Sequence, residues 1–571
     1  MITLLLLHPA LAAAPSSGPD PVLDAMVDEL DRVEDLSLEG APRAYFASYR
    51  VFDGDSVHLT ASLGGLVRDD SGPSRQGTVS VRVGSADQDN GNFQSMFNST
   101  RGFGALELVL APDTLALRHD LWLQTDRAYK GAVENLARKL ASERGETGVD
   151  PTPSFVLTPP IVAAFPAGAA PDHDALAALA RAVSARFLTH PEVEASRVYI
   201  AAGGGRDLLV DTTGTRLVRP SEELDLRIVA TARAADGHTI SDHQTFIVRN
   251  ATALPSQSRL EAAADDLAAR LEHWRVAVTP EAPYVGPVIF EGDAAVDLFR
   301  RMLVPALSGT PPMERAHGGM GSDDESPTAL SLKRRVLPPG FSVVDDPTAE
   351  PALPSSYVYD DEGVAAQRTP LVTDGIVRGL LASRIPSHDA PASNGHGRDV
   401  SREEVRAMPS FLQVAVERAL SANRLYALAL QTAKDYDLDH ILVVRRLADP
   451  SLEQGSSRSF FLSMMGGSPA AELPDPVEVV ERYADGHEVA VRGLQWNGVD
   501  RRILRDILAA GASTRATFLQ PGGGMSFGDR ATAGLPVTIE APSVLVSEVE
   551  LDPDTGAVPT VPKLPSPLLG G

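Results

Sequence analysis

Hydrophobic residues recur every three or four positions in several segments, which is the spacing of one face of an α-helix. In Pro21–Val33, the residues Leu23, Met26, Leu30 and Val33 follow this spacing with acidic residues between them, so the segment predicts an amphipathic helix. The same reading predicts helices at residues 114–144, 171–189, 256–274, 294–307, 425–437 and 500–510.

Short runs rich in β-branched and aromatic residues predict β-strands between these helices. The first runs are Ala44–Phe52, Ser56–Leu63 and Thr78–Gly84, and Asp53-Gly54-Asp55 separates the first two. Because glycine and aspartate favour turns, we expect separate short strands on the two sides of this tripeptide. Later runs lie at residues 196–201 and 207–211, joined across a Gly-Gly-Gly segment, and at residues 225–233.

The length of the chain, 571 residues, exceeds what one hydrophobic core usually supports, so we expect several domains. A proline-rich stretch at residues 150–160 follows the first long helix, and prolines at 280, 283 and 287 mark a second boundary. We therefore predict an N-terminal domain of residues 20–165, a middle domain of residues 166–280 and a last domain of residues 284–571.

Composition excludes several classes of function. The chain has 76 acidic and 51 basic side chains, a formal charge of −25, and such a surface repels a phosphate backbone. We therefore expect no nucleic-acid partner. The chain has no cysteine, which excludes disulfides, thiolate nucleophiles and zinc sites that use sulfur. Beyond the N-terminus, no segment has the ~20 apolar residues of a membrane-spanning helix, so we expect no integral membrane segment.

The first 14 residues are typical of a signal peptide. A short apolar run at Ile2–Leu7 precedes small residues, and Ala10-Leu11-Ala12 fits a small-x-small cleavage site, although no lysine or arginine precedes the run. We predict export to the periplasm, with a cytoplasmic location as the alternative.

Three patches carry a resemblance to a known family. The first comprises Ser342–Thr348 (SVVDDPT), Tyr359–Val364 (YDDEGV) and Arg368–Gly375, the second is Ser393–Arg398 (SNGHGR), and the third is Glu540–Val546 (EAPSVLV). In sequence and in order along the chain, these patches resemble the TldD/PmbA family of metallopeptidase-like proteins. The chain is more similar to the TldE/PmbA-type subunits, which lack the metal motif.

The resemblance implies an α+β fold, with a mixed α/β N-terminal region of two subdomains followed by a β-rich C-terminal domain. Metal-binding members carry an HExxxH helix shortly after the strand that opens the last domain. Its ligand positions fall here on Arg300, Arg301 and Pro305. A guanidinium group only donates hydrogen bonds, and a proline side chain offers no ligand atom, so we expect neither a metal nor another cofactor. Arg300 or Arg301 could instead bind a carboxylate, such as the C-terminus of a peptide.

The resemblance also places the loop at residues 386–398 near the family's cleft. This loop is low in apolar residues and predicts a mobile segment. Its polar residues His388, Asn394, His396 and Arg398 are therefore candidate substrate-binding residues.

Other polar groups have simpler interpretations. Asp360, Asp361 and Glu362 could serve acid–base chemistry, but in the family pattern they lie at a tight turn that satisfies them. His238 and His243, in DGHTISDH, are interpreted as hairpin residues rather than metal ligands.

These observations predict a catalytically degenerate subunit or peptide-binding partner in the proteolysis of small or unfolded peptides. Its expected partners are a peptide and either a homologous TldD-like subunit or a second copy of itself. Two alternatives stay open. The chain could be an active peptide hydrolase that uses a site unlike the family's, or a non-enzymatic, homodimeric envelope protein.

Overall fold

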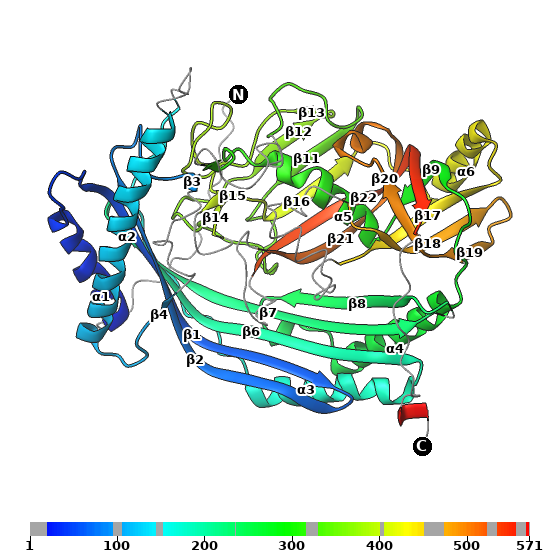
Figure 1. The fold of residues 1–571 in the computed structure, drawn as a ribbon, viewed down its shortest axis with the longest axis horizontal. Coiled ribbons are helices and arrows are strands. Elements are labelled where there is room, and N and C mark those ends of the chain that lie inside the picture. The colour runs from blue at the N-terminus through cyan, green and yellow to red at the C-terminus, as the bar shows by residue number, and fades with distance from the viewer. Residues whose placement is uncertain are drawn as a thin grey trace, which may run out of the picture.

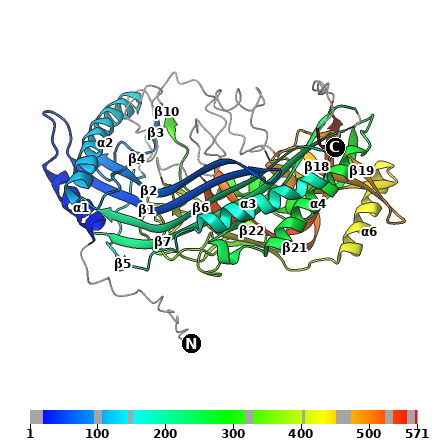
Figure 2. The ribbon, with the colours of Figure 1, turned by 90° about the horizontal axis from the view of Figure 1, so that it is seen from below.

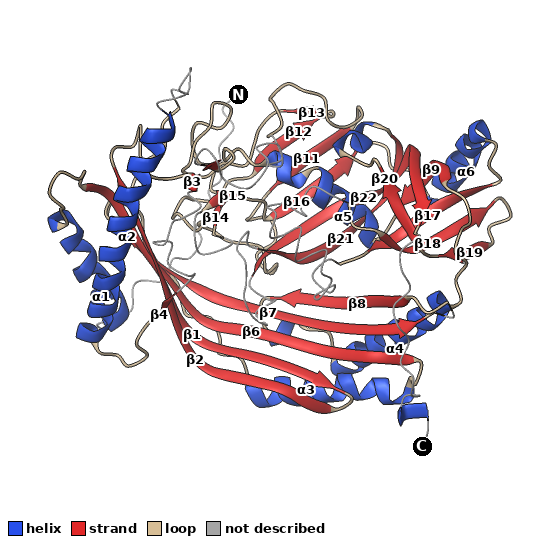
Figure 3. Cartoon of the chain, in the orientation of Figure 1, coloured by secondary structure: helices blue, strands red, loops and turns tan. Residues whose placement is uncertain are grey.

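The computed structural model describes residues 20–94, 106–143, 152–234, 236–315, 329–399, 405–449, 473–521, 534–554 and 567–569. Within these ranges, helices and long strands form two halves, each built on its own large sheet (Figures 1 and 3). The α+β class is therefore confirmed. The predicted signal peptide lies outside the described residues. No described helix has the length and apolar character needed to cross a membrane.

A seven-stranded sheet forms the N-terminal half. Its order is β4-β2-β1-β6-β7-β5, and β8 pairs with β7. The two predicted N-terminal subdomains therefore share one continuous sheet. The strands are β1 (Ala44–Ser62), β2 (Gly65–Val83), β4 (Leu106–Glu107), β5 (Val162–Ala164), β6 (Val193–Asp211), β7 (Arg216–Arg233) and β8 (Thr239–Val248).

The prediction of short, separate strands was wrong in this sheet. Asp53-Gly54-Asp55 continues β1 and pairs with Gly204-Gly205-Arg206 of β6. A Cβ atom on Gly54 would lie 2.2 Å from the carbonyl oxygen of Gly204, so the glycines permit close approach of two strands rather than a turn. The turn between β1 and β2 lies instead at Leu63 and Gly64, whose φ angles are 49° and 84°.

Four helices cover one face of this sheet (Figures 1 and 2). Alternate residues of β1 enter two cores: Tyr49 packs under α1 and α2, and Leu59 packs under α3 and α4. The other face of the sheet is left for the C-terminal half. The helices are α1 (Pro21–Leu30), α2 (Thr114–Glu143), α3 (His173–Ala185) and α4 (Gln257–Arg275), all close to their predicted positions.

The C-terminal half contains an eleven-stranded sheet in the order β13-β12-β11-β16-β22-β9-β17-β18-β19, with β20 and β21 also paired to β22. Helices α5 (Asp293–Met302) and α6 (Ala422–Ala433) pack on it. The strands are β9 (Tyr284–Phe290), β11 (Phe341–Asp345), β12 (Thr369–Thr373), β13 (Ile376–Val377), β16 (Phe411–Val416), β17 (His440–Leu447), β18 (Pro476–Tyr483), β19 (Glu488–Val491), β20 (Leu494–Asn497), β21 (Ile507–Pro521) and β22 (Gly534–Pro553).

Two local predictions were wrong in this half. The predicted helix at residues 500–510 is a 3₁₀ turn, Arg501–Arg505, followed by β21. The predicted short strand Glu540–Val546 is the middle of the 20-residue β22. Both differences arise because β22 pairs with several neighbours, and that pairing overrides local propensity.

Two two-stranded sheets complete the described strands. In the first, β3 (Phe93–Gln94) pairs in parallel with β10 (Glu314–Arg315) and so connects the two halves. In the second, β14 (Gly397–Arg398) pairs with β15 (Arg406–Ala407).

Candidate functional site

Helix α5 carries the positions where the family resemblance places metal ligands. Its apolar side is buried, and Arg300 and Arg301 extend from its polar side. Arg300 Nε lies 2.8 Å from Asp297 Oδ1, and the guanidinium group lies 4.4 Å from the centre of the Phe518 ring on β21. Pro305 lies in the 3₁₀ turn that follows the helix.

These residues do not fit a divalent metal ion. Arginine offers only hydrogen-bond donors and carries the wrong charge for a cation. In the part of the chain that the structure describes, no group of three His, Asp or Glu residues is placed to hold a metal. The α5 position is therefore a site for polar or anionic ligands rather than for a cationic metal.

Polar residues of the N-terminal sheet and of α5 interact electrostatically with the same residue, Asp449. Asp225 of β7 is 2% exposed, and its Oδ2 accepts a 2.7 Å hydrogen bond from Arg227 Nε. Its Oδ1 has no hydrogen-bond partner among the described residues. His243 Nε2 of β8 lies 3.9 Å from Asp449 Oδ2, which follows β17. Electrostatic interactions of Asp449 reach β7, β8 and α5. We name as the α5 cluster Asp225, Arg227, His243, Asp297, Arg300, Arg301 and Asp449.

Four groups of the α5 cluster are shifted toward their neutral forms. Burial raises the pKa of Asp225 to about 6 and also raises that of Asp297. Burial lowers the pKa of His243, and burial together with the neighbouring Arg300 lowers the pKa of Arg301 to about 10. The opposite charges in the cluster therefore compensate only part of the desolvation penalty.

A second charged cluster includes Arg219, which also lies on β7. Arg219 precedes Asp225 by six residues, which corresponds to about 20 Å at the usual rise of a strand. Arg219 Nη2 donates to Asp207 Oδ2 at 2.5 Å and to Asp361 Oδ1 at 2.7 Å. Arg50 Nη2 lies 2.7 Å from Asp207 Oδ2 and 3.1 Å from Asp361 Oδ1, and its Nη1 lies 3.3 Å from Asp399 Oδ2. We name as the joint cluster Arg50, Asp207, Arg219, Asp361 and Asp399, because it joins the two halves.

The joint cluster satisfies its own charges. Burial alone would raise the pKa of Asp207 and of Asp361, but Arg50 and Arg219 hold both below their usual range. Arg219 Nη1 also donates to the carbonyl oxygens of Tyr359 and Asp360, both at 2.9 Å. Both oxygens of Asp207 and both oxygens of Asp361 are paired, which indicates a structural role for these two acids, in contrast to Asp225.

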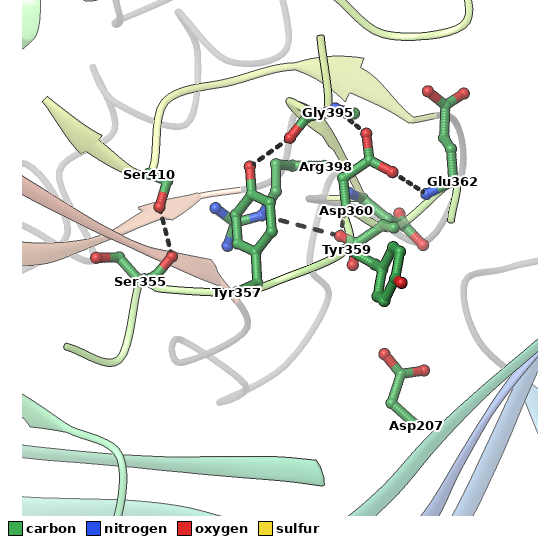
Figure 4. Close-up of polar contacts among 12 residues, drawn as sticks. Asp207, Ser355, Tyr357, Tyr359, Asp360, Glu362, Gly395, Arg398 and Ser410 are labelled. Carbon is green, nitrogen blue, oxygen red and sulfur yellow. Dashed lines mark hydrogen bonds and ion pairs between the residues drawn. The ribbon is translucent and has the colours of Figure 1, made fainter. Parts of the chain in front are cut away.

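The acidic turn lies beside the joint cluster (Figure 4). Asp360 accepts backbone hydrogen bonds from Glu362 (3.0 Å), Val364 (2.8 Å) and Gly397 (2.9 Å). Its carboxylate is therefore paired with backbone N–H groups, as expected for an acid at a tight turn. Glu362 Oε2 accepts the backbone N–H of Arg384 at 2.6 Å. Burial, with a further contribution from Asp360, raises the pKa of Glu362 to about 8.

The raised pKa of Glu362 predicts a dependence of stability on pH. A carboxyl group with a raised folded-state pKa contributes stability below its unfolded pKa of 4.5, and this contribution is lost as the pH rises through about 8. Glu362→Gln should therefore unfold at higher denaturant concentration than the wild type at pH 9, by roughly 1–2 kcal/mol in free energy. At pH 5 the difference should vanish. An equal difference at both pH values, measured by urea titration, would contradict the prediction.

His396 and Asn394 hold their loop from inside the protein. His396 is fully buried, and its Nε2 lies 3.0 Å from Oδ1 of the equally buried Asp345. Asn394 Oδ1 accepts the Ala382 N–H at 2.8 Å and lies 2.9 Å from His396 Nδ1. Asn394 Nδ2 donates to the Leu380 carbonyl, which fixes the amide orientation. Both ring nitrogens of His396 therefore face hydrogen-bonding partners, and Nε2 is directed at Asp345.

The other two candidates of this loop occupy opposite environments. Arg398 is 5% exposed, and its guanidinium group lies 4.7 Å from the centre of the Tyr357 ring. The side chain of His388 is 92% exposed and lies near Asp389 alone among the described residues. Residues 395–398 are buried rather than forming the loose segment that the composition predicted. His396 and Arg398 are thus buried and His388 is exposed, and the role of the loop candidates in substrate binding stays a prediction.

Sequence reasoning missed Asp225 and Asp449 and assigned His243 to a hairpin. A signal was present in β7, where the buried Leu224, Leu226 and Ile228 alternate with Asp225 and Arg227. This alternation places two charges on the face opposite the helices. Only the tertiary structure shows that His243 of β8 interacts electrostatically with Asp297 of α5.

The comparisons with known proteins agree with this architecture. Residues 283–425 match the model of the PmbA/TldA metallopeptidase C-terminal domain. A metalloprotease of Methanocaldococcus jannaschii is 30% identical over 126 residues, which cover 20% of this chain and 27% of that protein. The match therefore spans about a quarter of the relative's length.

Solved structures share the fold over most of the chain. A protein described as a modulator of DNA gyrase from Thermotoga maritima aligns with a TM-score of 0.54 at 14% identity, covering 92% of this chain and 100% of that one. TldE from Thermococcus kodakarensis aligns with a TM-score of 0.54 at 13% identity, covering 92% and 99%. The fold and the matched domain define a metallopeptidase-like protein. The matched domain, the relative and the shared fold together support a member of the TldD/PmbA family.

Proposed function

We propose that this chain is a TldD/PmbA-family subunit that binds short or unfolded peptides without a metal ion of its own. It assists a homologous, metal-binding subunit in proteolysis or acts as a homodimer. The observation that carries the proposal is the pair of guanidinium groups on α5, at the positions that hold metal ligands in metal-binding members. Export to the periplasm belongs to the same proposal.

The surroundings of α5 support a role in binding. Arg300 is held by Asp297 and Phe518, so its guanidinium group loses little side-chain entropy when it binds a ligand. Arg301 lies in a desolvated environment, where a bound anion would be attracted more strongly than in water. Both features favour recognition of the carboxylate of a peptide.

Arg300→Ala tests this proposal. We expect the variant to bind tetraalanine about 10-fold more weakly than the wild type in calorimetry, because it loses one charge-assisted hydrogen bond. Amidating the C-terminus of the peptide should weaken binding to the wild type by a similar factor and should have little further effect on the variant. Arg181→Ala, on the exposed side of α3, is the matched control and should bind like the wild type.

Two results would contradict the proposal. One is binding of tetraalanine that depends on neither the peptide carboxylate nor Arg300. The other is stoichiometric zinc in the purified protein together with peptidase activity that a chelator abolishes. Size measurement in solution, alone and with a metal-binding paralogue, separates the homodimer from the mixed assembly.

A second candidate function is favoured by Glu362. A carboxyl group whose pKa is about 8 can act as a general acid near neutral pH. Peptidase activity that resists chelators and disappears in Glu362→Gln would identify the chain as a hydrolase with a site unlike the family's. Chelator-resistant activity that survives this substitution would exclude Glu362 as the acid.

A further inference from the structure

Asp225 Oδ1 is a carboxylate oxygen of the α5 cluster that no described residue satisfies. Asp225 is 2% exposed, and Arg227 satisfies only its Oδ2. A buried carboxylate oxygen without a donor is unfavourable, and buried polar groups in native proteins are otherwise paired. In the joint cluster, on the same face of the same sheet, both oxygens of Asp207 and both oxygens of Asp361 accept hydrogen bonds. The free oxygen therefore marks a place for a donor that comes from outside the chain.

We infer that Asp225 receives the primary ammonium group of a bound peptide, which is either the N-terminus or a lysine side chain. The inference rests on the proposed peptide-binding function. It adds which chemical group of the peptide Asp225 recognises. A metal ion is a poorer occupant, since no three metal-ligating residues gather there within the described chain. An ammonium group needs fewer fixed ligands, because it brings three N–H donors of its own.

The charge balance of the α5 cluster agrees with such a ligand. The α5 cluster holds three carboxylates and three guanidinium groups, which lie on β7, on α5 and directly after β17. Burial lowers the pKa of His243, so this side chain is neutral at pH 7.5. Because the cluster carries no net charge, a peptide whose ammonium and carboxylate groups also cancel can enter without leaving an uncompensated charge. Its ammonium group would lie toward Asp225 and its carboxylate toward α5.

Calorimetry with matched peptides tests the inference at pH 7.5. Wild-type protein should bind tetraalanine about 10-fold more tightly than N-acetyl-tetraalanine, the usual scale of one charge-assisted hydrogen bond. N-acetyl-Ala-Lys-Ala-Ala distinguishes the two sources of the ammonium group. If the lysine peptide binds like tetraalanine, the site accepts any primary ammonium; if it binds like N-acetyl-tetraalanine, the site takes the N-terminus.

Asp225→Asn should reduce the preference for tetraalanine over its acetylated form to less than about 2-fold. Arg227 can only donate, so the asparagine must turn its oxygen to Arg227 and its NH₂ group to the ligand, where two donors meet. The comparison of two peptides within one variant does not depend on the fraction of folded protein. Glu194→Gln, which removes an exposed ion pair with Arg233 on the same sheet, is the control and should keep the wild-type preference.

The outcomes separate this inference from the proposed function. If no peptide binds, the proposed function fails. If peptides bind through their carboxylate but the wild type ignores acetylation, or if Asp225→Asn keeps the full preference, the ammonium site is overturned and the proposed function stands. Loss of the preference in Asp225→Asn alone supports the site.

Discussion

Arg219→Met should destabilise the protein by about 3–5 kcal/mol, which is the usual effect of removing one partner from a buried ion pair. Arg219 bonds Asp207 and Asp361, and all three side chains are largely buried between the two halves. Methionine is of similar length but cannot donate. Asp207 would then keep Arg50 as its ion-pair partner, and Asp361 would keep Arg50, the backbone N–H of Asp399 and the more distant Arg398. Chemical denaturation followed by circular dichroism measures the change.

Arg181→Met is the control for this substitution. Arg181 is exposed on α3, so its replacement should change stability by less than about 0.5 kcal/mol. Because Arg219 connects β7 to the C-terminal half, we also expect the variant to unfold in two separate transitions. A variant as stable as the control would show that the joint cluster does not hold the halves together.

His396→Phe should destabilise the protein by a comparable amount, about 3–5 kcal/mol. The ring volume is kept, but Asp345 loses the imidazole that faces it while remaining fully buried. Asp345 would keep only the backbone N–H of Ser410, which lies 3.0 Å from its Oδ2. Thermal and urea unfolding both measure the loss.

His388→Phe is a control from the same loop, because its side chain is 92% exposed and its replacement should be nearly neutral. The double variant Asp345→Asn/His396→Phe should recover part of the lost stability, since it no longer buries an unpaired charge. If His396→Phe is as stable as His388→Phe but weakens peptide binding, His396 acts in binding rather than in holding the loop.

The helices show which parts of this fold the local sequence predicts correctly. The helices Pro21–Leu30 and Gln257–Arg275 form close to their predicted positions. An amphipathic helix needs only one apolar surface on which to pack its apolar face, so its sequence pattern predicts it without knowledge of the partner. The glycine segments were misinterpreted, because a glycine that permits a turn also permits two strands to approach closely. The neighbouring strand decides between these two outcomes, and it is about 150 residues away along the chain.

The candidate sites divide in the same way. The sequence alone places Arg300 and Arg301 on a helix after the first strand of the last domain, and their chemistry argues against a metal ion wherever they point. It also carries the motifs that indicate the TldD/PmbA family. Both conclusions depend only on the type and order of the residues, so they can be drawn without knowledge of any tertiary contact.

Tertiary structure alone decided which polar residues are structural and which interact with α5. His396 is buried against Asp345, although its polar loop predicted a mobile segment. His243 interacts electrostatically with Asp297 of α5, and Asp225 with Asp449, because the two halves pack together, and no local pattern specifies that packing. Burial then sets the charge state of each group, because the desolvation penalty depends on which residues far along the chain exclude water from it.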